Sequence, residues 1–223
     1  AFFPEFSDAP NVGDSASPNY ELIIKLQPDI VLLYAAGHSE EMAAIEKTLK
    51  TADPKISVVG FGFNQPSIFI KEFKTLSYIL GKTNEANEFI DFYSKWIDAI
   101  WEKTKDIPDN EKPTVYLETP YGSYGDNASY GTCTKDHWMG ERILMAGGYN
   151  IFSDIPGTKT MNVDPEEVMK RDPDIIVKDT YAGGYPEDHI SALIEVRTEV
   201  MNRPELANTT AVKNRQVYVI AHK

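Results

Sequence analysis

The chain has 223 residues, and its 22 Lys and Arg against 34 Asp and Glu give a formal net charge of −12. Its 42% of hydrophobic and 25% of charged residues are typical of a folded globular protein, long enough for one large domain or two small ones. The acidic balance argues against non-specific nucleic-acid binding, which needs clustered Lys and Arg, and no apolar run approaches the roughly 18 residues of a membrane-spanning helix. The single cysteine, Cys133, excludes an internal disulfide and a cysteine-based structural zinc site.

The first predicted elements alternate between helix and strand. Asn19 is expected to cap a short helix that ends at Pro28, because the residue before a proline avoids the α region. The apolar run 30–34 is predicted to be a buried strand, followed by a helix over 39–50 and a strand over 56–60. Helices and strands in this alternation indicate an α/β sheet.

Residues 66–107 are predicted to be helical almost throughout. Apolar residues recur at helical spacing in both halves, Gly81 marks a break, and Thr83 is expected to cap the second piece. A helix over 84–107 would be about 36 Å long at roughly 1.5 Å per residue. We therefore expect a stiff strut that joins two lobes.

A second group of α/β elements follows the strut. We expect a strand over 114–117, a loop rich in Gly and Tyr over 120–134, a helix over 136–146 and a short strand over 150–152.

Two segments of the chain, 19–31 and 164–176, share one pattern at an offset of 145, the difference 166 − 21. In both, a capped helix ends at Pro-Asp-Ile and leads into a strand, which covers 175–178 in the second copy. A helix over 187–201 and a strand over 217–220 complete the chain. The repeat predicts two lobes of similar α/β design.

Aromatic residues and histidines gather where the predicted strands end. Ligands of open α/β sheets bind at the carboxyl ends of the strands. Aromatic side chains offer flat apolar faces there, and Tyr, Trp and His add hydrogen-bonding groups, which suits a planar or ring-bearing ligand. The predicted ligand-binding residues are Tyr34, His38, Phe61, Phe63, Tyr121, Tyr124, Tyr130, His137, Trp138, Tyr181 and Tyr185.

Common catalytic and nucleotide-binding signatures are absent from the sequence. The triplet Gly81-Lys82-Thr83 resembles the end of a phosphate-binding loop, but Leu76 stands where that loop needs a glycine. None of the four histidines is paired at metal-ligand spacing. We therefore expect neither an enzyme nor a resident metal or cofactor.

Four segments, taken in order, carry a family resemblance. They are Glu-x-Ile-x-x-Leu-x-Pro-Asp-Ile-Val at 21–31, and residues 80–85, 146–151 and 211–218. Over nearly the whole chain they resemble the substrate-binding proteins of ABC importers for iron siderophores, haem and cobalamin, which form class III of the periplasmic binding proteins. No single segment is specific, but their order and spacing are.

The resemblance implies an α/β fold of two Rossmann-like lobes joined by a single long helix, with a ligand cleft between the lobes. It divides the chain into an N-terminal lobe over 1–65, a helical region with the interlobe helix over 66–108, and a C-terminal lobe over 109–223.

The resemblance also implies a function. Proteins of this class deliver an iron complex (a siderophore or haem) or a corrinoid to an ABC permease, and they act outside the cytoplasm. Their acidic docking residues correspond to Glu40 and Glu187 here, with Glu41 and Asp188 as neighbours that could substitute. We expect a monomer at the periplasm or cell surface, anchored to the membrane through a missing N-terminal segment and without nucleic-acid partners.

The chain departs from the class at both ends. Members usually begin with a strand, a helix and a strand before a Pro-x-Val-Gly segment, which here stands at 10–13, and they continue past the last strand into a helix. The expectation is a fragment, or the ordered part of a longer protein, with an incomplete N-terminal lobe.

Few basic residues fall near the predicted strand ends, which slightly favours a neutral or weakly charged ligand; the nearest are Lys135, Arg142, Lys159 and Lys178. If the ligand is haem, the candidates to bind its iron are Tyr34, Tyr130 and His137.

Two other functions on the same scaffold stay open at this point. One is a metal-dependent enzyme that uses His137 with Asp136 or Asp179. The other is a surface or sensor module that binds a protein.

Overall fold

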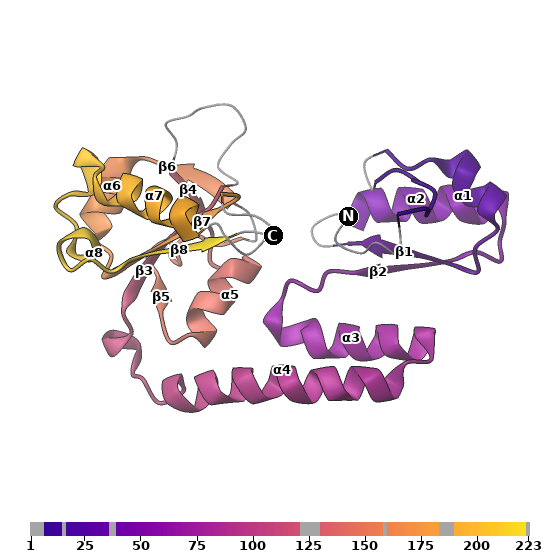
Figure 1. The fold of residues 1–223 in the computed structure, drawn as a ribbon, viewed down its shortest axis with the longest axis horizontal. Helices are drawn as coiled ribbons and strands as arrows, with labels where there is room; N and C mark the ends of the chain where they lie inside the picture. Colours follow the sequence, from indigo (N-terminus) through magenta and orange to yellow (C-terminus); the bar gives the residue numbers. More distant parts are fainter. Residues whose placement is uncertain are drawn as a thin grey trace. The chain divides into compact units, whose positions relative to one another are not determined.

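The computed structural model describes residues 7–14, 17–35, 39–120, 130–157, 160–182 and 190–221. The chain divides into two compact units, Ala1–Ala86 and Asn87–Lys223. It passes from the first unit to the second within one long helix, α4 (Thr83–Thr104), shown in Figure 1. The predicted mixed α/β class is confirmed.

The first unit alternates between helix and strand, as predicted. Strands β1 and β2 pair in parallel, with Ile30 opposite Ser57 and Tyr34 opposite Phe61. The elements of this unit are α1 (Tyr20–Leu26), β1 (Ile30–Tyr34), α2 (Ser39–Ala52), β2 (Ser57–Phe61) and α3 (Pro66–Leu80), followed by the first turn of α4.

A small apolar core holds this unit together. Ile23 of α1, Ile45 and Leu49 of α2, and Ile56 before β2 are buried, and partly buried side chains of both strands pack on them. The prediction that β1 is wholly buried is wrong, because Leu32 and Tyr34 are 44% and 56% exposed. Side chains alternate along a strand, so one face of β1 covers the core and the other does not.

Helix α4 begins just after Gly81, where the sequence predicts a break between two helices. Gly81 has a left-handed φ of +64°, which suits glycine, and the helix then runs for 22 residues, about 33 Å. Of its large apolar side chains only Ile90 is buried, whereas Phe92 and Trp96 are 61% and 57% exposed. The apolar pattern therefore predicted the helix correctly but not which of its residues are covered.

The second unit is built on a parallel sheet of four strands. The strand order is β5–β3–β7–β8, and a separate antiparallel pair joins β4 to β6. Its elements are β3 (Thr114–Glu118), β4 (Tyr130–Cys133), α5 (Trp138–Met145), β5 (Tyr149–Asn150), β6 (Thr160–Val163), α6 (Pro165–Arg171), β7 (Ile175–Thr180), α7 (Ile190–Met201), α8 (Thr210–Lys213) and β8 (Val217–Ala221), with 3-10 turns at Asp109–Glu111 and Pro204–Leu206.

The loop predicted over 120–134 contains a strand. Strand β4 pairs with β6, with Tyr130 opposite Val163 and Cys133 opposite Thr160. The pairing partner lies about 30 residues further along the chain; β4 lacks an alternating pattern, and β6 alternates polar and apolar residues over only four positions, which is too short to identify a strand by itself. Sequence periodicity therefore missed both strands.

The two copies of the repeat fold alike. The side chains of Asn19 and Asp164 each accept a backbone N–H in the first turn of their helices, α1 and α6, as predicted. Both helices end on a left-handed residue before proline, Gln27 and Asp172, with φ of 49° and 41°. Proline thus ends each helix as expected, but the preceding residue turns left-handed and is not extended.

Candidate ligand-binding site

In the first unit, the carboxyl ends of β1 and β2 present mainly aromatic and neutral groups. Tyr34 ends β1 and is 56% exposed, and its hydroxyl lies 3.5 Å from the Asn64 amide nitrogen as a hydrogen-bond acceptor. Phe63 is partly buried and stacks on Phe61, with ring centroids 5.0 Å apart. Phe61 itself is only 5% exposed, so it supports Phe63 and does not face a ligand.

In the second unit, α5 begins at the same edge of the sheet at which β3 and β7 end. Tyr181 follows β7 and is 58% exposed. Trp138, the first residue of α5, packs against the apolar cluster of Leu117, Cys133 and Met139. Its outer face is covered by the Arg142 guanidinium, 4.5 Å from the ring centroid. Tyr181 thus directly follows β7, and Trp138 packs beside Leu117, the residue before the last one of β3.

His137 serves as the cap of α5. Its Nδ1 accepts the Met139 N–H at 3.3 Å, and its ring lies against Trp138 with centroids 5.1 Å apart. Burial, together with the charge of Arg142, lowers the pKa of His137 to about 4, so the ring is neutral at pH 7. With Nδ1 accepting, the neutral ring carries its hydrogen on Nε2, so binding iron through Nε2 would require this cap to be lost.

A buried ion-pair network that the sequence analysis missed lies at the end of β3. Glu118 is 3% exposed; its Oε1 accepts from Lys178 Nζ at 2.6 Å, and its Oε2 accepts from the Arg203 guanidinium at 2.7 Å. Arg203 also pairs with Glu199. Burial opposes the charge of Arg203, but its hydrogen bonds to Glu199 and Glu118 raise the Arg203 pKa overall. Both cations are thus neutralised by the protein itself.

Tyr130 lies beneath this network and not in a loop. Its ring is 7% exposed in β4, lies parallel to Tyr116, and is covered by the Arg203 guanidinium at 4.8 Å. Burial raises the pKa of its hydroxyl, and the neighbouring Arg203 guanidinium opposes that shift. The predicted loop placement of Tyr130 is wrong, because the missed strand β4 carries the residue into the core.

Five predicted site residues lie outside the described residues, so the structure does not place them. They are His38, Tyr121, Tyr124, Tyr185 and the second-unit docking acid Glu187, whose neighbour Asp188 is also outside. Glu40, by contrast, is exposed in the first turn of α2, next to the exposed Glu41.

These features match one known family along the chain. The family model named "Periplasmic binding protein" matches residues 3–223. The chain belongs to the periplasmic binding protein family.

Individual relatives of this periplasmic binding protein are distant and longer. The chain is 27% identical over 212 residues to the Fe(3+)-citrate-binding protein YfmC of Bacillus subtilis. This alignment covers 95% of the chain and 59% of YfmC. It superposes on the TroA-like periplasmic binding protein FepB of Veillonella parvula with a TM-score of 0.76 and 24% identity, covering 98% of the chain and 65% of FepB. The S. aureus protein IsdE complexed with heme gives a TM-score of 0.66 and 21% identity, with 98% and 78% coverage. The chain thus spans less than two thirds of YfmC.

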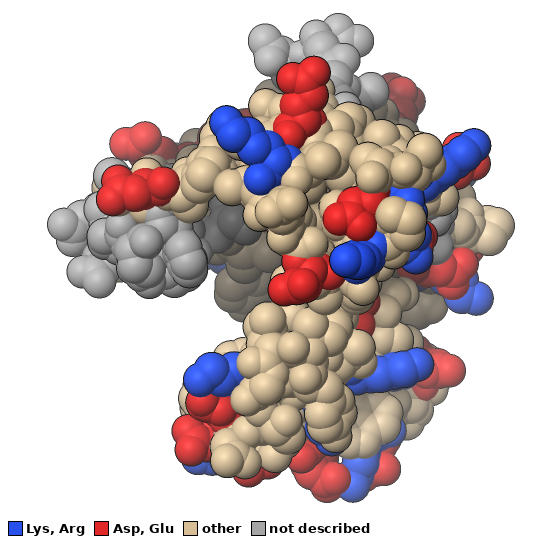
Figure 2. All heavy atoms as spheres, turned by 90° about the vertical axis from the view of Figure 1, so that its right-hand side faces the viewer, with Lys and Arg blue, Asp and Glu red and all other residues tan. Residues whose placement is uncertain are grey.

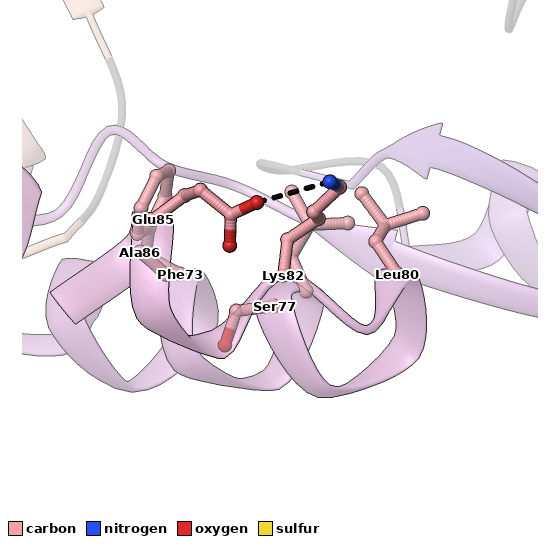
Figure 3. A pocket seen from close by; sticks show the side chains of 7 residues that line it. Phe73, Ser77, Leu80, Lys82, Glu85 and Ala86 are labelled. Carbon is pink, nitrogen blue, oxygen red and sulfur yellow. Dashed lines mark hydrogen bonds and ion pairs between the residues drawn. The ribbon is translucent and has the colours of Figure 1, made fainter.

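An apolar pocket of this periplasmic binding protein lies away from the strand ends, between the end of α3 and the start of α4 (Figure 3). Its volume is about 160 Å³, and the exposed ion pair of Lys82 with Glu85 lies beside it. Helix α3 is about 22 Å long and begins at the strand ends, so the pocket sits near its far end. It is lined by Phe73, Leu76, Ser77, Leu80, Lys82, Glu85 and Ala86, of which Phe73 also meets the Phe63 ring edge-on.

The remaining described side chains of the periplasmic binding protein concern metal ligands, the lone cysteine and the surface charge. Within the described ranges, no three His, Cys, Asp or Glu side chains gather to hold a metal ion. Burial raises the pKa of the Cys133 thiol to about 11, which leaves it protonated and unreactive at neutral pH.

On the face drawn in Figure 2, acidic and basic side chains are intermixed, so the net charge is not gathered there. In the described part of the chain, no helix is both long and apolar enough to span a membrane.

Proposed function

We propose that the chain is the ligand-binding part of an extracytoplasmic protein that captures a metal complex and delivers it to an ABC importer. The family supports this function, since YfmC is named for ferric citrate and IsdE for heme. A binding protein needs no acid, base or nucleophile, and the described strand ends offer aromatic rings, neutral groups and the cations Lys135 and Arg142.

The observation that carries the choice of ligand is the chemistry of the strand ends. In the first unit, the described residues 34–35 and 61–64 include no charged side chain. In the second unit, Lys178 and Arg203 are paired with Glu118 and are therefore not available to a ligand. The cations nearest to Trp138 are Arg142, which covers its ring, and the exposed Lys135, three residues before it in the chain. This set suits a ligand with a broad apolar face and a few anionic groups, such as haem or a modified corrin, over a small polyanion such as ferric citrate.

Titration of tryptophan fluorescence tests this proposal. We expect haemin to quench the emission saturably, and we expect a Trp138→Phe variant to lose most of the quenching. A Trp96→Phe variant is the matched control, because Trp96 is exposed on α4 and outside the candidate site. Flat curves with haemin, cyanocobalamin and ferric citrate would contradict the proposal. A response to ferric citrate alone would preserve the transport function and overturn the argument for an apolar ligand.

We further propose that Glu40 docks the first unit on the permease, in accord with the acids that the family uses. Its exposure at the start of α2 supports this role, although a carboxylate there is also favoured by the helix dipole. A Glu40→Lys variant is expected to retain ligand and lose most transport in reconstituted vesicles. Glu21→Lys, at another exposed acid in a first helical turn, is the control. Unchanged transport by Glu40→Lys would remove the docking role.

A further inference from the structure

The turn between β2 and α3 is held in a strained conformation. Phe63 has a φ of +53°, in the left-handed region that glycine adopts freely and that a bulky side chain rarely occupies. This residue follows the carboxyl end of β2, at the edge where the candidate site lies. Strain of this kind persists only where surrounding contacts enforce it, and it concentrates at functional sites.

The contact that enforces the strain is a carboxylate from the second turn of α3. Glu72 Oε1 accepts the Gly62 N–H at 3.0 Å, and Glu72 Oε2 accepts the Phe63 N–H at 2.7 Å. Both oxygens of one partly buried carboxylate are thus used on two consecutive backbone groups. Hydrogen bonds to an ionised acceptor are roughly twice as strong as neutral ones, so this pair is suited to hold a turn against its preferred geometry.

The conformation of this turn sets the position of the Phe63 ring. Besides stacking on Phe61, the ring meets Phe69 and Phe73 edge-on, with centroids at 6.1 and 6.4 Å. Phe69 and Phe73 stack on each other at 5.8 Å. Phe63 is therefore the ring that the other three contact.

The same turn is tied to the exposed aromatic residue of the neighbouring strand. Asn64, the next residue, donates to the Tyr34 hydroxyl at 3.5 Å, and the Ala35 N–H donates to the Phe61 carbonyl at 2.9 Å. A relaxed turn would release Phe63 from its cluster and Asn64 from Tyr34 together.

We infer that Glu72 is a positioning residue for ligand binding: it holds Phe63 left-handed and thereby fixes the aromatic surface that Phe63 and Tyr34 present. The inference rests on the proposed function for its ligand but not for its geometry. Glu72 touches no ligand itself, and it acts through the backbone of the turn.

A double-mutant cycle between Glu72 and Phe63 tests the inference. The amide of Glu72→Gln offers only one acceptor oxygen, so we expect the affinity for haemin to fall about tenfold. Glycine at position 63 adopts positive φ without strain, so in the Phe63→Gly background the Glu72→Gln change is expected to cost no further affinity. Equal losses in both backgrounds would overturn the inference. Lys71→Gln, at the exposed neighbouring position of α3, is the control and is expected to change nothing.

A second readout needs no ligand. With 4-fluorophenylalanine incorporated, the ¹⁹F resonance of Phe63, assigned by Phe63→Leu, is expected to shift and broaden in Glu72→Gln and to stay fixed in Lys71→Gln. An unmoved resonance in folded Glu72→Gln would overturn the inference. If haemin does not bind the unchanged protein, a moved resonance still supports the positioning of Phe63, and the missing affinity counts against the proposed function alone.

If Glu72→Gln does not fold but the strain-free Phe63→Gly/Glu72→Gln protein does, the turn depends on Glu72 as inferred. Failure of both to fold would assign Glu72 a general structural role and overturn the inference.

Discussion

A Glu118→Gln variant is expected to lose about 3 to 5 kcal/mol of the free energy of unfolding of the second unit. The carboxylate is shared by Lys178 and Arg203, whose side chains are only 17% and 16% exposed. Removing its charge leaves the poorly hydrated Lys178 facing a neutral amide and leaves Arg203 with Glu199 as its remaining ion-pair partner, and the uncompensated burial of Lys178 is costly. The same pair of hydrogen bonds joins β3 to β7 and to the turn after α7, so three elements are affected at once.

Urea denaturation measures this effect. In a Trp96→Phe/Trp101→Phe background, the emission of Trp138 reports on the second unit alone. Glu102→Gln is the matched control, because Glu102 is 65% exposed and pairs with Lys105 on the surface, where such a pair contributes less than about 1 kcal/mol. A loss below about 1 kcal/mol for Glu118→Gln would show that the network does not stabilise the unit.

A Leu49→Ala variant is expected to destabilise the first unit by about 2 to 5 kcal/mol. Leu49 is fully buried in a small apolar cluster with Ile23, Ile45 and Ile56, which are 7%, 3% and 2% exposed. Domains gain about 0.05–0.15 kcal/mol of stability per residue, so a unit of residues 1–86 has little reserve against such a cavity.

Hydrogen exchange resolves this prediction by unit. Amides of β1, β2 and α2 are expected to exchange about 30- to 3,000-fold faster in Leu49→Ala, while amides of β3 and β7 keep their protection. Leu26→Ala is the control, since Leu26 is 49% exposed. Equal acceleration in both units would show that they unfold as one and contradict the division into two.

Local signals in the sequence predicted most of the elements. The side chains of Asn19 and Asp164 cap their helices as expected, Gly81 breaks the long helical region, and both repeat helices end before Pro28 and Pro173. Each of these features depends on interactions within a few residues, which a pattern in the chain can reveal.

What sequence reasoning missed depends on contacts between distant residues. The strand that carries Tyr130 pairs with residues 160–163, and Glu118 meets Arg203 across 85 positions. The sequence places the basic residue Lys178 near a strand end, but no neighbouring residue in the chain shows that Glu118 neutralises it. Positive φ at Phe63 gives no sequence signal either, because the residue is not glycine and its carboxylate partner lies nine residues away.

Among the predicted ligand-binding residues, Tyr34, Phe63, His137, Trp138 and Tyr181 stay candidates at strand ends or at the start of α5. Phe61 and Tyr130 are buried, because a strand end can place alternate side chains in the core. The three-part division 1–65, 66–108 and 109–223 stays a prediction, beside the two compact units in which the boundary falls inside α4.

The most direct test of the binding account is hydrogen exchange of the protein with and without haemin. Bound haemin is expected to add protection at the strand ends of both units, in the segments 34–35, 61–64, 137–142 and 180–182. No change is expected around the pocket of Leu76 and Leu80 at the end of α3. Protection confined to that pocket or to the exposed face of α4, or no protection anywhere at saturating haemin, would contradict the binding account.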